Sequence, residues 1–128
     1  MGKKVLVVDD HPSIHVLMKH ILEELEDRDV ELLLASDGRK GLELALDKRP
    51  NLVFLDVTIP YLSGYEVCRR IKATNSETRV ILLTGEVMEE DHKLVEAGAD
   101  GYIVKPFYPD QIIKEATSAL ELVPGTKS

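Results

Sequence analysis

The residues best suited to chemistry are carboxylates, a hydroxyl and an ammonium that directly follow short apolar segments. Asp9 and Asp10, Asp56, Thr84 and Lys105 stand in this position in four different parts of the chain. A carboxylate at the end of an apolar segment costs free energy unless a cation or a hydrogen-bond donor compensates it. Whether these groups can act together depends on the fold that positions them.

The apolar segments are continuous and do not alternate with polar residues. Val5–Val8, Leu52–Leu55 and Val80–Leu83 are each four residues of this kind, which is typical of strands buried on both faces of a parallel sheet. Val30–Ala35 and Gly101–Val104 are more mixed in composition. We therefore expect these two segments at the edges of the same sheet.

Helical spacing of apolar residues fills the intervals between and after these strands. We expect helices after Pro12 as far as Leu25, around 42–46 before Pro50, from about Ser63, over about 87–97 with Gly98 as a cap, and from about 109. Five consecutive strand–helix units predict an α/β fold with a doubly wound, five-stranded parallel sheet covered by helices on both faces.

In a parallel sheet, all the carboxyl ends of the strands lie on one rim, and ligands bind there where the strand order reverses. In the order 2-1-3-4-5, strands one and three adjoin at that point, so Asp9, Asp10 and Asp56 would meet in one cleft. Three close carboxylates require a shared proton or a cation, and hard oxygen ligands suit Mg²⁺. Thr84 and Lys105 could hold the oxygens of a phosphoryl group, with Asp56 as its nucleophile.

Taken singly, these residues have ordinary interpretations. Asp10 could cap a turn or a helix, Thr84-Gly85 could be a plain turn, and Lys105 could be a surface lysine. Their joint placement at four strand ends is what indicates a site.

Composition limits the classes of partner. The chain has 128 residues, 44% of them hydrophobic, and a net charge of −7, which fits one domain and argues against direct contact with nucleic acid or an anionic membrane. The single cysteine excludes an internal disulfide, and no apolar segment resembles a signal peptide or a membrane span. We expect a cytoplasmic protein with a domain at 1–123 and a disordered tail at 124–128.

Four motifs give the chain a specific resemblance. VLVVDD, LVFLDVTIPYLSGYEVCRRIK, ILLTG and AGADGYIVKPF resemble the receiver domain of response regulators, the CheY-like phosphoacceptor of two-component (phosphorelay) signalling. The resemblance extends over roughly Lys3 to Leu122. It implies a CheY- or flavodoxin-like fold.

The resemblance also implies a role for each site residue. Asp56 would be phosphorylated, Asp10 and Asp56 would ligate Mg²⁺ together with the carbonyl of Thr58, and Asp9 would act mainly through water. Thr84 and Lys105 would contact the phosphoryl oxygens. No further cofactor is implied.

The family pattern further implies a switch. Thr84 would move toward the phosphoryl group and Tyr102 would rotate into the space it leaves, while the Lys105–Pro106 peptide bond would be cis. The output surface would be helix four, strand five and helix five. Thr58 and Glu86 would influence the lifetime of the phosphate.

The implied partners are a sensor histidine kinase or histidine phosphotransfer protein as donor, and a target protein or effector domain as receiver of the signal. Phosphorylation could also lead to a homodimer. Such a domain is not an enzyme with a separate substrate, since it catalyses only its own phosphorylation and dephosphorylation.

Three other functions agree less well with the sequence. A phosphatase of the haloacid-dehalogenase type would have a second Asp two residues after the nucleophile, where this chain has Thr58. A flavin-binding protein of flavodoxin type would need a phosphate-binding loop where Asp9 and Asp10 would repel the phosphate. A binding module that is never phosphorylated would not need the intact set of acids, Thr84 and Lys105.

Other chemically suggestive residues carry less weight. His11 and His15 are four apart, a spacing that could hold a transition metal on a helix, but Pro12 places His11 before the helix. Cys68 is expected to be a partly buried structural thiol. The basic residues Arg69, Arg70 and Lys72 are expected to form a solvated helix face.

Overall fold

The computed structural model describes residues 2–85 and 92–121. Within these residues the chain forms one parallel sheet in the order β2-β1-β3-β4-β5. The strands are β1 (Lys3–Val8), β2 (Val30–Ala35), β3 (Leu52–Asp56), β4 (Arg79–Thr84) and β5 (Gly101–Val104). The predicted strand order is confirmed, and both mixed segments lie at the edges as expected.

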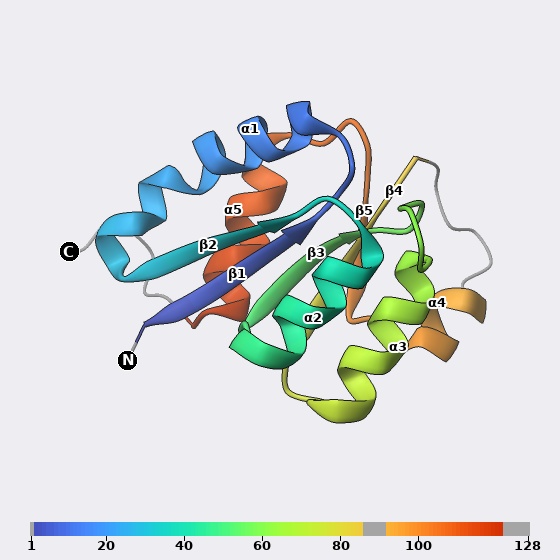
Figure 1. Ribbon diagram of the computed structural model, residues 1–128. Helices are drawn as coiled ribbons and strands as arrows, with labels where there is room; N and C mark the ends of the chain where they lie inside the picture. Colours follow the sequence, from blue (N-terminus) through green and yellow to red (C-terminus); the bar gives the residue numbers. More distant parts are fainter. Residues whose placement is uncertain (1, 86–91, 122–128) are drawn as a thin grey trace.

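Helices cover both faces of this sheet (Figure 1). They are α1 (Pro12–Leu22), α2 (Gly38–Lys48), α3 (Gly64–Thr74), α4 (His92–Ala97) and α5 (Pro109–Ala119), with a short 3₁₀ segment, η1 (Glu23–Arg28), after α1. Helices α1 and α5 pack on one face, and α2, α3 and α4 on the other. The layered architecture follows from the alternation of strand and helix along the chain.

Successive residues of the central strands point to opposite faces, so each strand contributes to two cores. On the face of α1 and α5 the fully buried strand residues include Val5, Val7 and Phe54. On the other face Leu6 and Val53 pack against α2, α3 and α4. The two cores hold the three central strands from both sides, and therefore fix where their carboxyl ends lie.

The starts of the helices follow from local sequence. The side chains of Asp37 and Ser63 cap α2 and α3 by accepting hydrogen bonds from backbone N–H groups three residues later. Pro12 and Pro109 begin α1 and α5, since proline lacks an N–H group that the first helical turn would leave unpaired. Gly98 follows α4 with a φ of 76°, a conformation that glycine adopts without strain.

Two expectations about the helices differ from the structure. The first α-helix ends at Leu22, and the chain continues to Arg28 as the 3₁₀ segment η1. Lys72 is not part of a solvated helix face: its ammonium donates to the carbonyls of Ser76 and Thr78 at 3.0 and 2.8 Å and pairs with Asp100 at 3.0 Å.

Some expectations fall outside the described residues. These are the first part of the fourth helix at 87–91, the role of Glu86 and the disordered tail at 124–128. Among the helices of the described residues, none is long and apolar enough to cross a membrane.

Candidate functional site

The candidate functional side chains lie at the carboxyl ends of the strands. Asp9 follows β1, Asp56 ends β3, Thr84 ends β4, and Lys105 follows β5. Strands β1 and β3 are neighbours, with Val8 paired to Leu55. The sheet therefore brings Asp9 and Asp56 together at the point where the strand order reverses, as expected for this topology.

Lys105 links these two acids. Its Nζ lies 2.7 Å from Asp9 Oδ2 and 3.0 Å from Asp56 Oδ2. The backbone N–H of Lys105 donates to the carbonyl of Thr84 at 2.7 Å, which ties the end of β5 to β4. The Lys105–Pro106 peptide bond is cis. One ammonium thus lies between two carboxylates at a partly enclosed rim.

Burial and hydrogen bonding act in opposite directions on the bridged groups. Asp9 is fully buried, and burial alone would raise the pKa of its carboxyl group. Hydrogen bonds from Lys105 and His11 outweigh this effect and lower that pKa below its ordinary value. Burial would lower the pKa of Lys105, but its hydrogen bonds to Asp9 and Asp56 raise it. The bridge therefore keeps both partners charged.

His11 belongs to the same cluster, a contact that sequence reasoning missed. Its backbone N–H donates to Asp9 Oδ1 at 2.9 Å, and its Nδ1 lies 2.8 Å from the same oxygen and 3.4 Å from Asp10 Oδ1. The hydrogen bond to Asp9, followed by the charges of Asp9 and Asp10, raises the pKa of the exposed His11 ring. The signal in the sequence was an Asp two residues before the histidine, a spacing at which Asp commonly bonds the backbone.

The considered pairing of His11 with His15 is not formed. His15 Nε2 lies 3.1 Å from the carbonyl oxygen of Ala35 at the end of β2, whereas His11 faces Asp9. The turn at Pro12 thus separates the roles of the two rings.

Asp56 is held at its place by the loop that follows it. Its Oδ1 accepts a hydrogen bond from the N–H of Thr58 at 3.0 Å. Gly64, the first residue of α3, donates to the carbonyl of Val57 at 3.0 Å. A Cβ at Gly64 would overlap the carbonyl oxygen of Asp56 and lie 2.6 Å from the Cα of Val57. Sequence reasoning assigned no role to this glycine, although only glycine fits so close to the backbone.

The remaining expected site residues lie around this centre. Asp10 is exposed beside His11, and Thr58 is exposed in the loop after β3. Thr84 is buried at the end of β4. Tyr102 is partly buried and packs on the same core as Leu82, its register partner on β4. Thr84 lies two residues after Leu82, so it points to the same face of the sheet as Tyr102.

The four ligand-bearing side chains Asp9, Asp10, His11 and Asp56 have ligand atoms within 4.8 Å of one another. Three of them offer carboxylate oxygens, the ligands that Mg²⁺ and other hard cations prefer. The donor set therefore fits a magnesium ion.

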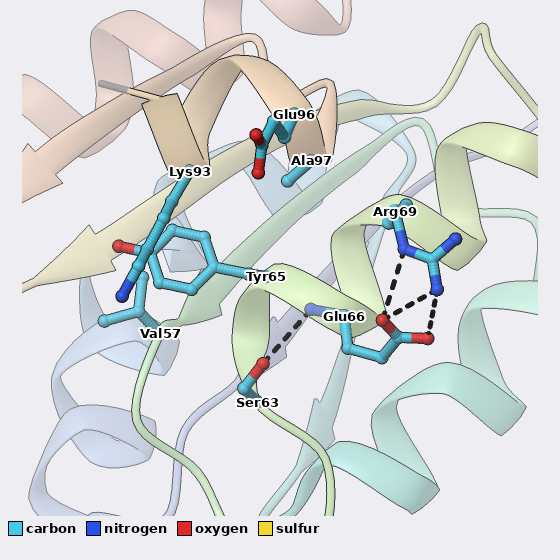
Figure 2. A pocket seen from close by; sticks show the side chains of 8 residues that line it. All are labelled: Val57, Ser63, Tyr65, Glu66, Arg69, Lys93, Glu96 and Ala97. Atoms are coloured by element: carbon cyan, nitrogen blue, oxygen red, sulfur yellow. Dashed lines mark hydrogen bonds and ion pairs between the residues drawn. The ribbon is translucent and has the colours of Figure 1, made fainter. Parts of the chain in front are cut away.

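A separate cavity of about 490 Å³ lies between α3 and α4. Figure 2 shows it lined by Val57, Tyr65 and charged side chains, with Glu66 paired to Arg69. Its lining does not include Asp9, Asp56 or Lys105. We therefore assign the chemistry to the rim of the sheet and not to this cavity. Cys68 is fully buried near it and donates to the carbonyl of Ala97 at 3.3 Å, so it is more deeply buried than expected.

Comparison with known proteins agrees with this arrangement. Among solved structures, the BeF3-activated receiver domain of DrrB superimposes with a TM-score of 0.82 at 38% identity, covering 94% of this chain and 99% of that one. The chemotaxis protein CheY4 of Vibrio cholerae superimposes with a TM-score of 0.81 at 31% identity, covering 93% and 99%.

Relatives in sequence are longer proteins. The transcriptional regulatory protein PhoP for alkaline phosphatase synthesis of Bacillus subtilis is 39% identical over 113 residues, 88% of this chain and 46% of that protein. The DNA-binding response regulator MtrA of Mycolicibacterium smegmatis is 32% identical over 94% of this chain and 51% of its own. This chain thus spans about half the length of the curated relatives it matches.

The model of the response regulator receiver domain family matches residues 5–117, a range that contains the whole acid–lysine cluster and all of the sheet except the first two residues of β1. With the sheet order, the rim of acids and the relatives in agreement, the chain belongs to the response regulator receiver domain family.

Proposed function

We propose that Asp56 accepts a phosphoryl group from the phosphohistidine of a sensor histidine kinase or a histidine phosphotransfer protein. The observation that carries this proposal is the position of Lys105, whose ammonium lies 3.0 Å from Asp56 Oδ2 and 2.7 Å from Asp9 Oδ2. An ammonium held at a nucleophilic carboxylate can offset the charge of an incoming phosphoryl group. The family of the chain supports the same reading.

Mg²⁺ is the cation we propose for this site. Asp10 and Asp56 would hold it directly together with the carbonyl of Thr58, and Asp9 would act mainly through water. Asp10 is exposed, which suits an ion that keeps several water ligands. When bound, the ion supplies positive charge that stabilises the oxygens of the transferring group.

The transfer balances without another reactant. A carboxylate oxygen of Asp56 forms a bond to phosphorus while the phosphorus–nitrogen bond of the donor breaks, and the leaving imidazole takes up a proton from solvent. The Lys105 ammonium and the Thr84 hydroxyl donate hydrogen bonds to the phosphoryl oxygens. Dephosphorylation ends the signal: water attacks phosphorus, inorganic phosphate leaves, and the Asp56 carboxylate is restored. The chain catalyses only these two steps on itself.

The phosphorylated state would be communicated by Thr84 and Tyr102. Both residues point to the same face of neighbouring strands, so movement of Thr84 toward the phosphoryl group would free space into which Tyr102 can turn. We propose that this changes the surface of α4, β5 and α5, which binds a target protein or effector domain. Homodimerisation through α4 and α5 is testable by sedimentation with and without a phosphoryl mimic.

We propose that this domain does not itself contact DNA or a membrane and acts in the cytoplasm. Its net charge of −7 would repel a polyanion. MtrA is described as a DNA-binding response regulator, and this chain spans 51% of it. DNA binding in that protein is therefore compatible with a receiver that passes its signal to another domain.

The test is a mass measurement after incubation with Mg²⁺ and acetyl phosphate. The wild-type chain should gain about 80 Da, the mass of one phosphoryl group, and should not gain it when EDTA removes the metal. Asp56→Asn should gain nothing. Asp47→Asn, which alters an exposed carboxylate on α2, should behave as wild type. An equal gain in Asp56→Asn would refute the assignment of the acceptor.

A further inference from the structure

The loop of residues 57–63, between β3 and α3, carries Thr58 and is attached at its inner side to the sheet. The N–H of Val57 donates to the carbonyl of Leu83 at 3.0 Å, and Gly64 donates to the carbonyl of Val57 at 3.0 Å. These bonds fix the loop where it leaves Asp56. They do not hold the outer turn of the loop, around Tyr61.

The outer turn contains an unusual backbone conformation. Tyr61 has a φ of 75°, in the left-handed region that residues other than glycine, asparagine and aspartate seldom adopt. Its side chain is 73% exposed, so burial of the ring does not explain why a tyrosine stands there. A backbone outlier in a loop beside a functional site is a reason to look for a role.

The contact that the ring does make is with Arg39. The guanidinium of Arg39 lies 4.7 Å from the centroid of the Tyr61 ring, within the range of a cation–π interaction. Arg39 is the second residue of α2, whose first turn is fixed by the side chain of Asp37, which accepts from the N–H of Lys40 at 2.7 Å. The backbone that carries Arg39 is therefore fixed by the capped start of α2.

The backbone supports the same attachment. The N–H of Gly38, the first residue of α2, donates to the carbonyl of Pro60 at 3.0 Å. A Cβ at Gly38 would overlap the carbonyl oxygen of Leu62 and lie 2.9 Å from its Cβ. The close approach of α2 and the loop brings Arg39 next to Tyr61.

We propose that Arg39 and Tyr61 form a clamp that holds the loop 57–63 against α2, and that this clamp positions Thr58 for Mg²⁺ binding and for protection of the phosphorylated Asp56. Both are positioning residues, because neither reaches the reacting atoms. The inference rests on the proposed phosphorylation of Asp56 with Mg²⁺. The left-handed conformation of Tyr61 is then the cost of directing its ring to Arg39.

The test compares three substitutions that separate ring, charge and backbone. Tyr61→Phe keeps the stacked ring. Tyr61→Gly removes the ring but adopts a φ of 75° without strain. Arg39→Ala removes the cation, and its matched control Lys40→Ala removes the same charge from the same helical turn, where the ammonium pairs with Glu43 at 3.8 Å instead of with Tyr61.

Two quantities are measured for each purified full chain: the affinity for Mg²⁺ by calorimetry, and the half-life of the acetyl-phosphate-labelled form by mass spectrometry. Tyr61→Gly and Arg39→Ala should each weaken Mg²⁺ binding and shorten the half-life by about two- to five-fold, the size expected for an exposed cation–π contact. The double variant, with Tyr61→Gly and Arg39→Ala together, should lose no more Mg²⁺ affinity and no more half-life than either single variant. Tyr61→Phe and Lys40→Ala should match wild type in both quantities. The melting temperatures of the variants should not rank in the same order as their Mg²⁺ affinities and half-lives.

The proposal is overturned if Tyr61→Gly matches wild type, because the backbone conformation alone would then suffice. It is also overturned if the losses of the two single variants add in the double variant, or if Lys40→Ala equals Arg39→Ala. Hydrogen exchange of the amides in the loop 57–63 is recorded for the same chains without Mg²⁺. If wild type neither binds Mg²⁺ nor takes up phosphate, the proposed function fails, and faster exchange in Tyr61→Gly and Arg39→Ala still decides whether the clamp exists.

Discussion

Asp56 Oδ2 lies 3.0 Å from Nζ of Lys105, a residue 49 positions further along the chain. The same ammonium lies 2.7 Å from Asp9 Oδ2, so a single cation compensates two carboxylates at the rim of the sheet. A buried carboxylate without such a partner is costly. The bridge is therefore a structural condition for placing two carboxylates where apolar strands end.

Replacing this cation should destabilise the chain when no metal is present. Lys105→Met should lower the free energy of unfolding by about 1–3 kcal/mol in the presence of EDTA, because Asp9 and Asp56 lose their shared partner. Mg²⁺ should restore part of the loss by supplying another cation. Urea unfolding with and without Mg²⁺ measures both effects.

The control for this prediction is Lys114→Met, which removes an exposed lysine from α5 and should change stability by less than about 0.5 kcal/mol. Equal losses for the two variants would show that the bridge is not a significant stabilising contact. No recovery of Lys105→Met with Mg²⁺ would show that the ion does not take the place of the ammonium.

The sequence predicted the sheet and the positions of its strand ends because the signals are local. Continuous apolar segments such as Leu52–Leu55 specify buried parallel strands, and the strand order then brings the residues after them to one rim. The structure confirms this arrangement for Asp9, Asp56, Thr84 and Lys105.

Such local signals do not predict contacts between side chains from distant segments. The sequence makes Lys72 look like a surface lysine in a basic helical segment, but three acceptors in the segments that precede β4 and β5 surround its ammonium. The stack of Arg39 on Tyr61 likewise depends on a backbone approach between α2 and the loop 57–63. Neither contact follows from periodicity or spacing, since both require the packed fold.

The acid–lysine bridge should give stability a defined dependence on pH in the absence of metal. The pKa of Asp9 is held below its ordinary value of 3.8, so the stability it contributes is present above pH 3.8 and is lost as pH falls through the lower folded value. The pKa of Lys105 is raised above 10.5. Its contribution is therefore present below pH 10.5 and is lost as pH rises through the higher folded value.

The measurement is the midpoint of urea unfolding as a function of pH. Asp9→Asn should flatten the acid side of the profile, because the variant no longer has a carboxylate with a depressed pKa at this position. Asp47→Asn, at an exposed carboxylate, should keep the wild-type slope. A wild-type acid slope in Asp9→Asn would mean that other carboxylates determine acid unfolding.

Gly64 should be essential for the position of Asp56. A Cβ at this residue would overlap the Asp56 carbonyl oxygen, and backbone atoms of a central strand cannot move aside without disturbing the core. Gly64→Ala should lower the free energy of unfolding by about 1–3 kcal/mol and should slow labelling by acetyl phosphate. Gly85→Ala serves as the stability control, since a Cβ there would have no atom within 4 Å; similar losses in both variants would contradict the steric argument.

The proposed switch should require the hydroxyl of Thr84. In the chain labelled with fluorotyrosine, the ¹⁹F NMR signal of Tyr102 should shift when Mg²⁺ and acetyl phosphate are added. This signal is assigned as the one that is missing in Tyr102→Phe. Thr84→Ala should take up phosphate without this shift, because nothing draws the side chain away from the face that it shares with Tyr102. Thr84→Ser keeps the hydroxyl and should retain the shift. A shift of wild-type size in Thr84→Ala would show that Tyr102 responds independently of Thr84.

Cys68 should be unreactive in the folded chain, although it is the single cysteine. Burial raises the pKa of its thiol to about 12, and its Sγ donates to the carbonyl of Ala97 at 3.3 Å between α3 and α4. The thiolate, which is the reactive form, is therefore scarce at neutral pH. Iodoacetamide at pH 8 should leave the native chain unmodified over a period that fully alkylates the chain unfolded in urea. Alkylation of the native chain at the rate of a free thiol would show that α3 readily moves away from the elements that bury this sulfur.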